Sequence, residues 1–189
     1  KSPIVKKLIE KGIPVISEIE FAAPFTKAIT IGITGSNGKT TTTMLTYHLL
    51  KQGGLNVGLG GNIGKSFAWQ VAEEHYDSYV LELSSFQLDG IINYKPHIAI
   101  ITNISPDHLD RYDYKYENYL ASKFRITMNQ TEEDYLIYDA DDEAIGNWLK
   151  NNKVKAQLIP FSISKSIENG AFLNNNTMEI NINQEEFLM

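Results

Sequence analysis

A glycine-rich stretch, Gly32 to Thr43, contains the residue types that hold a nucleotide phosphate. It reads GITGSNGKTTTT, which departs from the common pattern G-x-x-x-x-G-K-[ST] because Ile33 stands at its first glycine. Gly35 could make the tight turn two residues later, while Lys39 offers charge to phosphate and Thr40 offers a hydroxyl to magnesium. The alternative is an ordinary strand-to-helix turn. Because the stretch follows an apolar, β-branched run and opens a predicted helix, we predict phosphate binding.

A carboxylate and an asparagine follow two other predicted strands. Glu82 closes the apolar run 79–81, at the sheet edge where ligands gather, and a buried charge there needs a partner. Magnesium is favoured by the neighbouring glycine loop, and pairing with a lysine or with backbone N–H groups is the alternative. Asn62 follows Gly60-Gly61, so its amide could bind substrate or could simply form a turn.

The polar segment 103–111 contains one histidine among carboxylates. His108 could ligate a metal, contact substrate or be solvated, and its position alone favours none of these. Asp107 and Asp110 could cap the next element or orient the imidazole, and the sequence leaves both roles open.

One lysine lies on the apolar side of a predicted helix, residues 114–127. At 100° per residue, Lys123 falls in the middle of the apolar stripe, whereas Arg125 is expected to point into solvent. The stripe consists of Tyr119, Leu120, Phe124 and Ile126. Snorkelling of the lysine to the surface is the alternative. The position favours a functional use of the amine, or of a group made from it.

The elements that must position these residues alternate between strands and helices. The runs 79–83 and 97–102 are almost entirely apolar, which is typical of strands covered on both faces. We predict strands at 28–34, 55–59, 79–83, 97–102, 135–138 and 157–161, an extended segment at 13–16, and helices at 3–12 (capped by Ser2), 39–52, 66–74, 114–127 and 142–150. Residues 171–173 and 178–182 predict a C-terminal hairpin. The fold class is α/β, a doubly wound, mostly parallel sheet with ligands at the carboxyl ends of its strands.

Composition narrows the classes of function. The chain has 189 residues, of which 42% are hydrophobic, enough for a substantial core. A net charge of −6 without a basic run argues against nucleic acid or a membrane as partner. The absence of cysteine excludes disulfides, thiolate zinc sites and a cysteine nucleophile, and fits a cytoplasmic protein. The chain begins at Lys1, so we expect it to be a piece of a longer protein.

Taken together, five spaced motifs resemble those of the Mur ligases of bacterial peptidoglycan synthesis. They are TGSNGKTT (34–41), GNIG (61–64), ELSSFQL (82–88), DHLDR (107–111) and ASKFR (121–125), in the order of that family. The family's glycine loop also departs from the standard phosphate-loop pattern. The resemblance covers about residues 12–161, and the segment SSFQ is most similar to members of the family that add D-glutamate.

The resemblance implies an ATP site and two magnesium sites. It places the ATP phosphates on Gly35, Ser36, Asn37, Gly38, Lys39, Thr40 and Thr41. Lys39 would contact the γ-phosphate, and Thr40 and Glu82 would hold one magnesium ion. His108 would hold the second together with Lys123, whose amine would be carbamylated and so would become an oxygen ligand. Lys39, His108 and Lys123 would be the catalytic residues.

The resemblance also implies the substrates. Asn62, Ser84, Gln87 and His108 would bind UDP-N-acetylmuramoyl-L-alanine near its terminal carboxylate. ATP would phosphorylate that carboxylate to an acyl phosphate, which the amine of D-glutamate would attack. The alternatives are a ligase similar to folylpolyglutamate synthase, expected to differ at 86–88, and a nucleotide-binding domain without ligase activity, which would not need Lys123.

The family's three-domain organisation sets the expected boundaries. Residues 1–26 would be the end of an N-terminal UDP-binding domain plus a linker, and 27–189 an incomplete central ATP-binding domain. We find no HN-x-x-N motif after Met178 and no glutamate-binding domain. We therefore expect a cytoplasmic, monomeric enzyme of which residues 1–189 alone lack turnover and keep weak affinity for ATP and magnesium at most.

Overall fold

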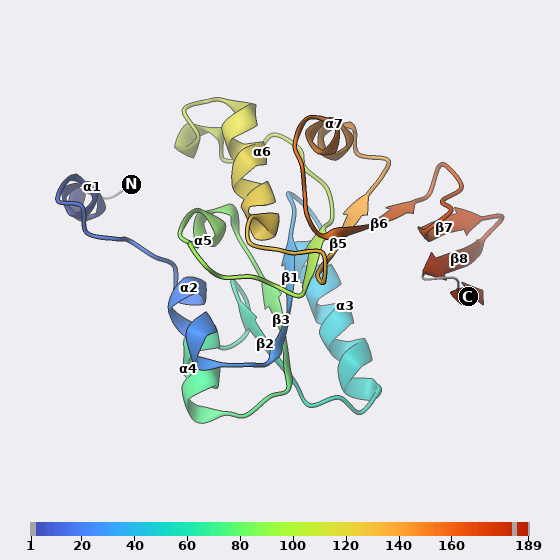
Figure 1. Ribbon diagram of the computed structural model, residues 1–189, viewed down its shortest axis with the longest axis horizontal. Helices are drawn as coiled ribbons and strands as arrows, with labels where there is room; N and C mark the ends of the chain where they lie inside the picture. The colour runs from blue at the N-terminus through green and yellow to red at the C-terminus, as the bar shows by residue number, and fades with distance from the viewer. Residues whose placement is uncertain (1–2, 183–184, 189) are drawn as a thin grey trace.

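A mixed sheet with helices on both faces forms the body of the protein (Figure 1). The computed structural model describes residues 3–182 and 185–188. Over these residues the strand order is β2-β3-β1-β4-β5-β6-β7-β8-β9, parallel as far as β7 and antiparallel from β7 to β9. The strands are β1 (Ile29–Thr34), β2 (Val57–Gly61), β3 (Ser78–Glu82), β4 (Ile98–Ile101), β5 (Tyr135–Asp139), β6 (Gln157–Ser162), β7 (Gly170–Asn174), β8 (Thr177–Ile182) and β9 (Glu185–Leu188). The predicted α/β class and C-terminal hairpin are confirmed.

Alternating side chains of the central strands divide the core between the two faces of the sheet. Tyr79 and Leu81 face α2 (Glu18–Ala22), α4 (Phe67–Glu73), α5 (Ser85–Asp89), α6 (Tyr116–Phe124) and α7 (Glu143–Asn151). Val80 faces the other way and packs with Ile31 and Ile33 on the side of α3 (Lys39–Gln52). Short 3-10 turns cover Ala23–Phe25, Leu109–Arg111 and Arg125–Thr127. None of the described helices is long and apolar enough to span a bilayer.

Most predicted elements are present, and the differences are local. The helix predicted at 39–52 has these bounds, whereas the one predicted at 114–127 covers only Tyr116–Phe124 before a 3-10 turn. The segment 13–16 is not a strand, and α2, α5 and β9 were not predicted. Five-residue helices such as α2 and α5 are too short to show a periodic pattern. The predicted cap at Ser2 lies outside the described residues.

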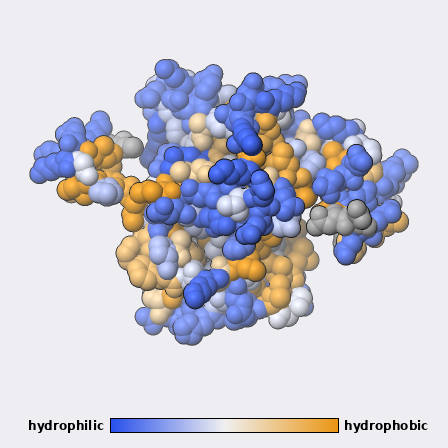
Figure 2. All heavy atoms as spheres, in the orientation of Figure 1, coloured by the Kyte–Doolittle hydropathy of each residue, from blue (hydrophilic) through white to orange (hydrophobic). Residues whose placement is uncertain are grey.

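The N-terminal helix α1 (Pro3–Glu10) stands apart from the body, joined by residues 11–17 (Figure 1). None of its residues is buried, and both hydrophilic and hydrophobic atoms lie on its surface (Figure 2). The chain first packs onto the body at α2, where Ile19 and Ala22 enter the core.

One buried carboxylate anchors α2 to the loop that precedes β4. Glu20 Oε2 accepts hydrogen bonds from the backbone N–H groups of Ile92 (2.9 Å) and Tyr94 (2.8 Å), and Oε1 accepts one from Asn93 (2.9 Å). Burial alone would raise the pKa of Glu20, but these donors together hold the pKa below its ordinary value. The ionised carboxylate therefore stabilises the junction between the linker and the body.

We expect Glu20→Gln to lower the free energy of unfolding by about 2 kcal/mol at neutral pH, because its amide nitrogen would face backbone donors. The pKa of Glu20 is lowered on folding, so the carboxylate contributes fully above the ordinary value of 4.5 and loses that contribution as pH falls below it. Urea unfolding should thus show a smaller difference between wild type and variant near pH 3.5 than near pH 7. Glu10→Gln, an exposed change in α1, is the control. An equal loss at both pH values would contradict the role of the charge.

Candidate functional site

The glycine loop connects β1 to α3 and is braced by the segment that follows β4. Gly35 makes the turn with φ of 147°, and a Cβ atom there would overlap Thr102 Oγ1, so the position requires glycine. The N–H of Ser36 donates to Asn103 O, and that of Asn37 donates to Asn103 Oδ1, both at 2.9 Å. The loop is therefore held in shape by the backbone and the side chain of Asn103.

Lys39 and Thr40 begin the helix at the end of this loop. The Lys39 ammonium turns back and donates to the carbonyls of Gly35 (3.0 Å) and Ser36 (2.9 Å). Thr40 Oγ1 donates to Glu82 Oε2 at 2.7 Å, across to the end of β3. Backbone N–H groups at the start of a helix, together with a lysine, form an environment suited to an anion.

Glu82 is a buried carboxylate without a cationic partner. It is 2% exposed, and Asn62 Nδ2 donates to its Oε1 at 2.8 Å. Within residues 3–182 and 185–188, no lysine, arginine or histidine side chain forms an ion pair with it. The alternative of a lysine partner is therefore wrong, and two neutral donors leave the buried negative charge uncompensated. A divalent cation between this carboxylate and the Thr40 hydroxyl fits that charge and its oxygen donors.

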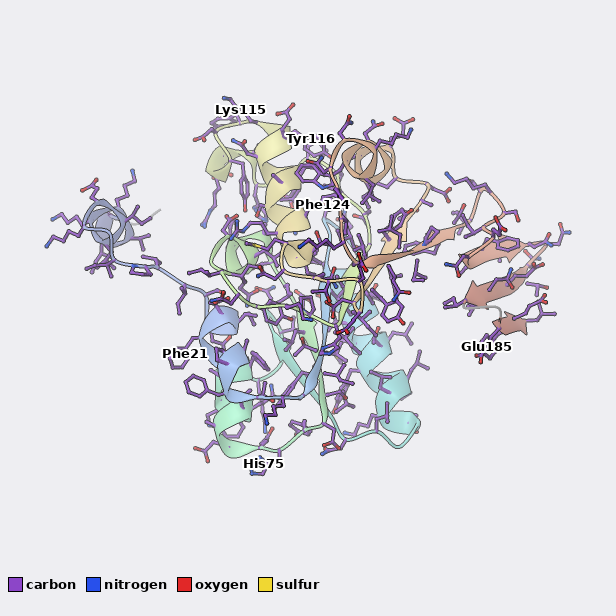
Figure 3. All side chains as sticks on the ribbon, in the orientation of Figure 1. Phe21, His75, Lys115, Tyr116, Phe124 and Glu185 are labelled. Carbon is purple, nitrogen blue, oxygen red and sulfur yellow. The ribbon has the colours of Figure 1, made fainter. Side chains whose placement is uncertain are left out.

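Lys123 is buried on α6, whose ends, Tyr116 and Phe124, are labelled in Figure 3. It is 2% exposed, as the helical projection predicted, and its Nζ donates to Gly35 O (2.8 Å) and Thr34 Oγ1 (3.3 Å). Burial, and then the charge of Lys39, lower the pKa of Lys123 from 10.5 to about 7. Near neutral pH much of this lysine is therefore an uncharged amine.

Arg125 does not point into solvent, so that prediction is wrong. Its Nε donates to Leu88 O at 2.7 Å and its Nη2 to Ile91 O at 2.5 Å. The α-helix ends at Phe124 and continues as a 3-10 turn, so the projection at 100° per residue no longer applies at Arg125.

A pocket of about 200 Å³ brings five of the predicted site residues together. It is lined by Lys39, Asn62, Ser84, His108 and Lys123. Gln87 is absent from this lining, because its Oε1 accepts hydrogen bonds from the Ser84 N–H (3.0 Å) and Oγ (2.9 Å) and so caps α5. Capping of α5 by Gln87 was not predicted from the sequence.

His108 lies at the rim of this pocket in a left-handed conformation, with φ of 49°. Its Nε2 is 3.5 Å from Asp107 Oδ2, its backbone N–H donates to Asp107 Oδ1, and its ring lies 5.4 Å from that of Phe86. Asp107 therefore contacts the histidine, whereas the side chain of Asp110 makes no hydrogen bond or ion pair with the described residues. Of the two open roles, orientation of the imidazole fits Asp107.

The sequence matches the family described as "Mur ligase middle domain" over residues 33–187. The chain belongs to the Mur ligase family. It is 65% identical over its whole length to a UDP-N-acetylmuramoylalanine--D-glutamate ligase of Christiangramia forsetii and covers 42% of that protein. It is 52% identical over its whole length to the same-named ligase of Bacteroides fragilis and covers 44% of it. The chain thus spans less than half the length of these relatives.

Solved structures of peptidoglycan and folylpolyglutamate ligases share the fold. A UDP-N-acetylmuramoyl-L-alanyl-D-glutamate--2,6-diaminopimelate ligase matches 97% of this chain and 41% of its own, with a TM-score of 0.67 at 18% identity. A bifunctional folylpolyglutamate synthase/dihydrofolate synthase matches 99% of this chain and 57% of its own, with a TM-score of 0.61 at 16% identity. These likenesses concern the fold alone.

Two residues of this Mur ligase site were not recognised from sequence. The Tyr119 hydroxyl lies 3.0 Å from Ser36 Oγ, and its ring centroid is 5.2 Å from Lys123 Nζ. Thr34 Oγ1 donates to Leu83 O at 2.8 Å while accepting from Lys123. Tyr119 precedes Lys123 by four positions and so lies on the same helix face, which could have identified it. Thr34 has no comparable signal.

The buried amine predicts an unusual dependence of stability on pH. The pKa of Lys123 falls from 10.5 to about 7 on folding, so from pH 7 to 10.5 the unfolded chain binds more protons and stability rises with pH. We expect Lys123→Met to be more stable than wild type at pH 7, by on the order of 2 kcal/mol, and to lose that advantage towards pH 10.

Urea unfolding in buffers free of carbon dioxide measures this, with Lys150→Met, an exposed change in α7, as the control. An advantage that stays constant across this range would show that the buried charge is not its source.

Proposed function

We propose that this chain carries the ATP-binding and phosphoryl-transfer centre of a ligase that adds D-glutamate to UDP-N-acetylmuramoyl-L-alanine in peptidoglycan synthesis. The observation that carries the proposal is the convergence of Lys39, Thr40, Glu82 and Lys123 around the glycine loop. The choice of substrates rests on the relatives at 65% and 52% identity, both named for D-glutamate ligation. The enzyme is an ATP-dependent acid–D-amino-acid ligase, and it acts in the cytoplasm as a monomer.

The glycine loop, from Gly35 to Thr41, binds the ATP phosphates. Its bracing by residues 102–105 keeps the backbone N–H groups in place before the nucleotide arrives. Lys39 gives up its hydrogen bonds to the Gly35 and Ser36 carbonyls and donates to the γ-phosphate instead. Phosphoryl transfer depends mainly on such positioning and charge neutralisation, and no protein nucleophile is required.

Thr40 and Glu82 would hold one magnesium ion, and the hydrogen bond from Asn62 orients the Glu82 carboxylate. Bound magnesium would neutralise negative charge on the transferring phosphoryl group. The fit rests on the buried, uncompensated charge of Glu82 and on the oxygen donors beside it.

Lys123 becomes a carbamate. Its neutral amine attacks carbon dioxide, forming an N–C bond as an electron pair of one C=O bond moves to oxygen, and releases one proton, so that an uncharged amine becomes an anionic oxygen ligand. Among the described residues no group of three histidine, aspartate or glutamate side chains could hold a metal. The carbamate supplies the oxygen ligand that His108 lacks for a second magnesium ion.

The pocket beside Lys123 binds the reacting end of the substrate. Its volume of about 200 Å³ is too small for the whole UDP-sugar peptide, so it accommodates the terminal carboxylate. Asn62, Ser84 and His108 contact that end, and Gln87 has its amide nitrogen available as a donor. The carboxylate attacks the γ-phosphorus and ADP leaves; the amine of D-glutamate then attacks the acyl carbon, and phosphate and a proton leave.

The rest of each substrate is bound outside the central domain. Residues 1–26 form the end of a UDP-binding domain plus a linker, which is consistent with a helix α1 that has no buried residue. Residues 27–189 form most of the ATP-binding domain, and a further domain binds D-glutamate.

In the full-length protein, phosphate release from ATP should require both UDP-N-acetylmuramoyl-L-alanine and D-glutamate, because each is consumed in forming the amide bond. A coupled phosphate assay measures it, with L-glutamate in place of D-glutamate as the matched control. Release without dependence on D-glutamate would refute the proposed substrate.

Replacement of the proposed carbamate separates this ligase from a domain that only binds nucleotide. We expect Lys123→Ala in the full-length protein to lower kcat at least about 100-fold, because an oxygen ligand is lost. A short carboxylic acid such as acetate should restore part of the rate by occupying the same space. Lys150→Ala should keep wild-type activity. Full activity of Lys123→Ala without added acid would favour the nucleotide-binding alternative.

A further inference from the structure

Besides Lys39 and Asn62, three separate segments form walls of the pocket beside Lys123. Helix α5 begins with Ser85 and Phe86, the loop before Leu109 carries Asp107 and His108, and α6 carries Lys123. We propose that Asp89, which does not line this pocket, is a positioning residue that fixes these segments relative to one another. The inference rests on the proposed function, because its consequence is the placement of the Lys123 head group.

The Asp89 carboxylate joins two buried hydroxyls. Ser122 Oγ donates to Asp89 Oδ1 at 2.7 Å, and the Tyr112 hydroxyl donates to Asp89 Oδ2 at 3.0 Å. Ser122 Oγ also lies 3.1 Å from Ser85 O and from the Tyr112 oxygen. Each hydroxyl has one proton, and the charged carboxylate is the strongest acceptor within reach, so both protons point to Asp89. We call these three side chains the Asp89 clamp.

Each member of the clamp belongs to a different wall. Asp89 is the last residue of α5, and Ser122 directly precedes Lys123 on α6. Tyr112 ends the 3-10 turn that follows His108, where its N–H donates to Leu109 O at 3.0 Å. Tyr112 and Ser122 are 7% and 3% exposed, so neither has alternative partners in solvent. Each clamp residue thus lies on the same short segment as a residue that lines the pocket, and Ser122 is directly adjacent to Lys123.

The proposed chemistry of Lys123 requires such an anchor. The amine is held by donating to Gly35 O and Thr34 Oγ1. A carbamate keeps one N–H, which can donate to only one of these two acceptors, and its oxygens are acceptors that cannot bond to the Gly35 carbonyl oxygen. The position of the head group then depends more on the backbone of α6, which the bond from Ser122 to Asp89 fixes beside the pocket.

The test uses the full-length protein with Asp89→Asn, Tyr112→Phe and both changes together. We expect each single variant to lower kcat for D-glutamate-dependent phosphate release about tenfold. The KM for ATP should change less than about twofold, because no clamp residue bonds to the loop 35–41. The double variant should lose less than the product of the two single effects, because both changes act on the Tyr112–Asp89 bond. Asp113→Asn, which removes an exposed charge nearby that makes no side-chain hydrogen bond, should match wild type.

A second measurement keeps the clamp testable without turnover. Hydrogen exchange should rise together in residues 85–89, 108–115 and 116–124 of Asp89→Asn, and stay unchanged in Asp113→Asn. Unchanged exchange in Asp89→Asn would overturn the clamp. If wild type is active, then equal activity of Asp89→Asn and Asp113→Asn, or single effects that multiply in the double variant, would also overturn it. If the wild-type protein shows no phosphate release that depends on D-glutamate, the proposed function is overturned instead. The hydrogen-exchange measurement alone then tests the Asp89 clamp.

Discussion

Two lysine side chains donate to one carbonyl oxygen, that of Gly35. Lys39 reaches it from α3 at 3.0 Å and Lys123 from α6 at 2.8 Å. The carbonyl is available to both because Gly35 turns the chain with a φ that favours glycine. Burial disfavours charge on Lys123, and repulsion by the Lys39 cation at the same acceptor adds to this, so that the pKa of Lys123 falls to about 7. The two lysines are therefore chemically different despite their shared contact.

The parallel register of the sheet brings the other groups to this carbonyl. In β1, Ile33 is paired with Glu82 of β3, and Thr34 is paired with Ile101 of β4. The carboxyl ends of the three strands therefore meet in one row, which places the glycine loop between Glu82 and the segment that starts at Thr102. Residues about twenty to seventy positions apart in sequence become neighbours because of this register, and no pattern within a single segment predicts their contact.

Local patterns in the sequence predicted those parts of the site that depend on a single element. The glycine loop, the bounds of α3 and the burial of Lys123 follow from turn residues and periodicity along one segment. The contacts of Arg125 with α5 were not predictable, because they depend on where α6 changes to a 3-10 turn.

Residues with two roles were harder still to assign. Gln87 was predicted to bind substrate, and its side-chain oxygen caps α5. Tyr119 was recognised only as part of an apolar stripe, although its hydroxyl reaches the glycine loop. A polar atom on a mostly apolar side chain takes its partner from the tertiary arrangement, and no sequence pattern specifies that partner.

The shared contact at Gly35 also has a consequence for the order of events in the proposed reaction. While Lys123 is an amine, both lysines compete for the carbonyl, and Lys39 is held away from the space that phosphate would take. A carbamate at Lys123 would keep only one N–H for the Gly35 carbonyl and would place a negative charge beside Lys39. The repulsion that lowers the pKa of Lys123 would then become an attraction between the two side chains. Modification of Lys123 would therefore change the electrostatics around Lys39 before any substrate binds.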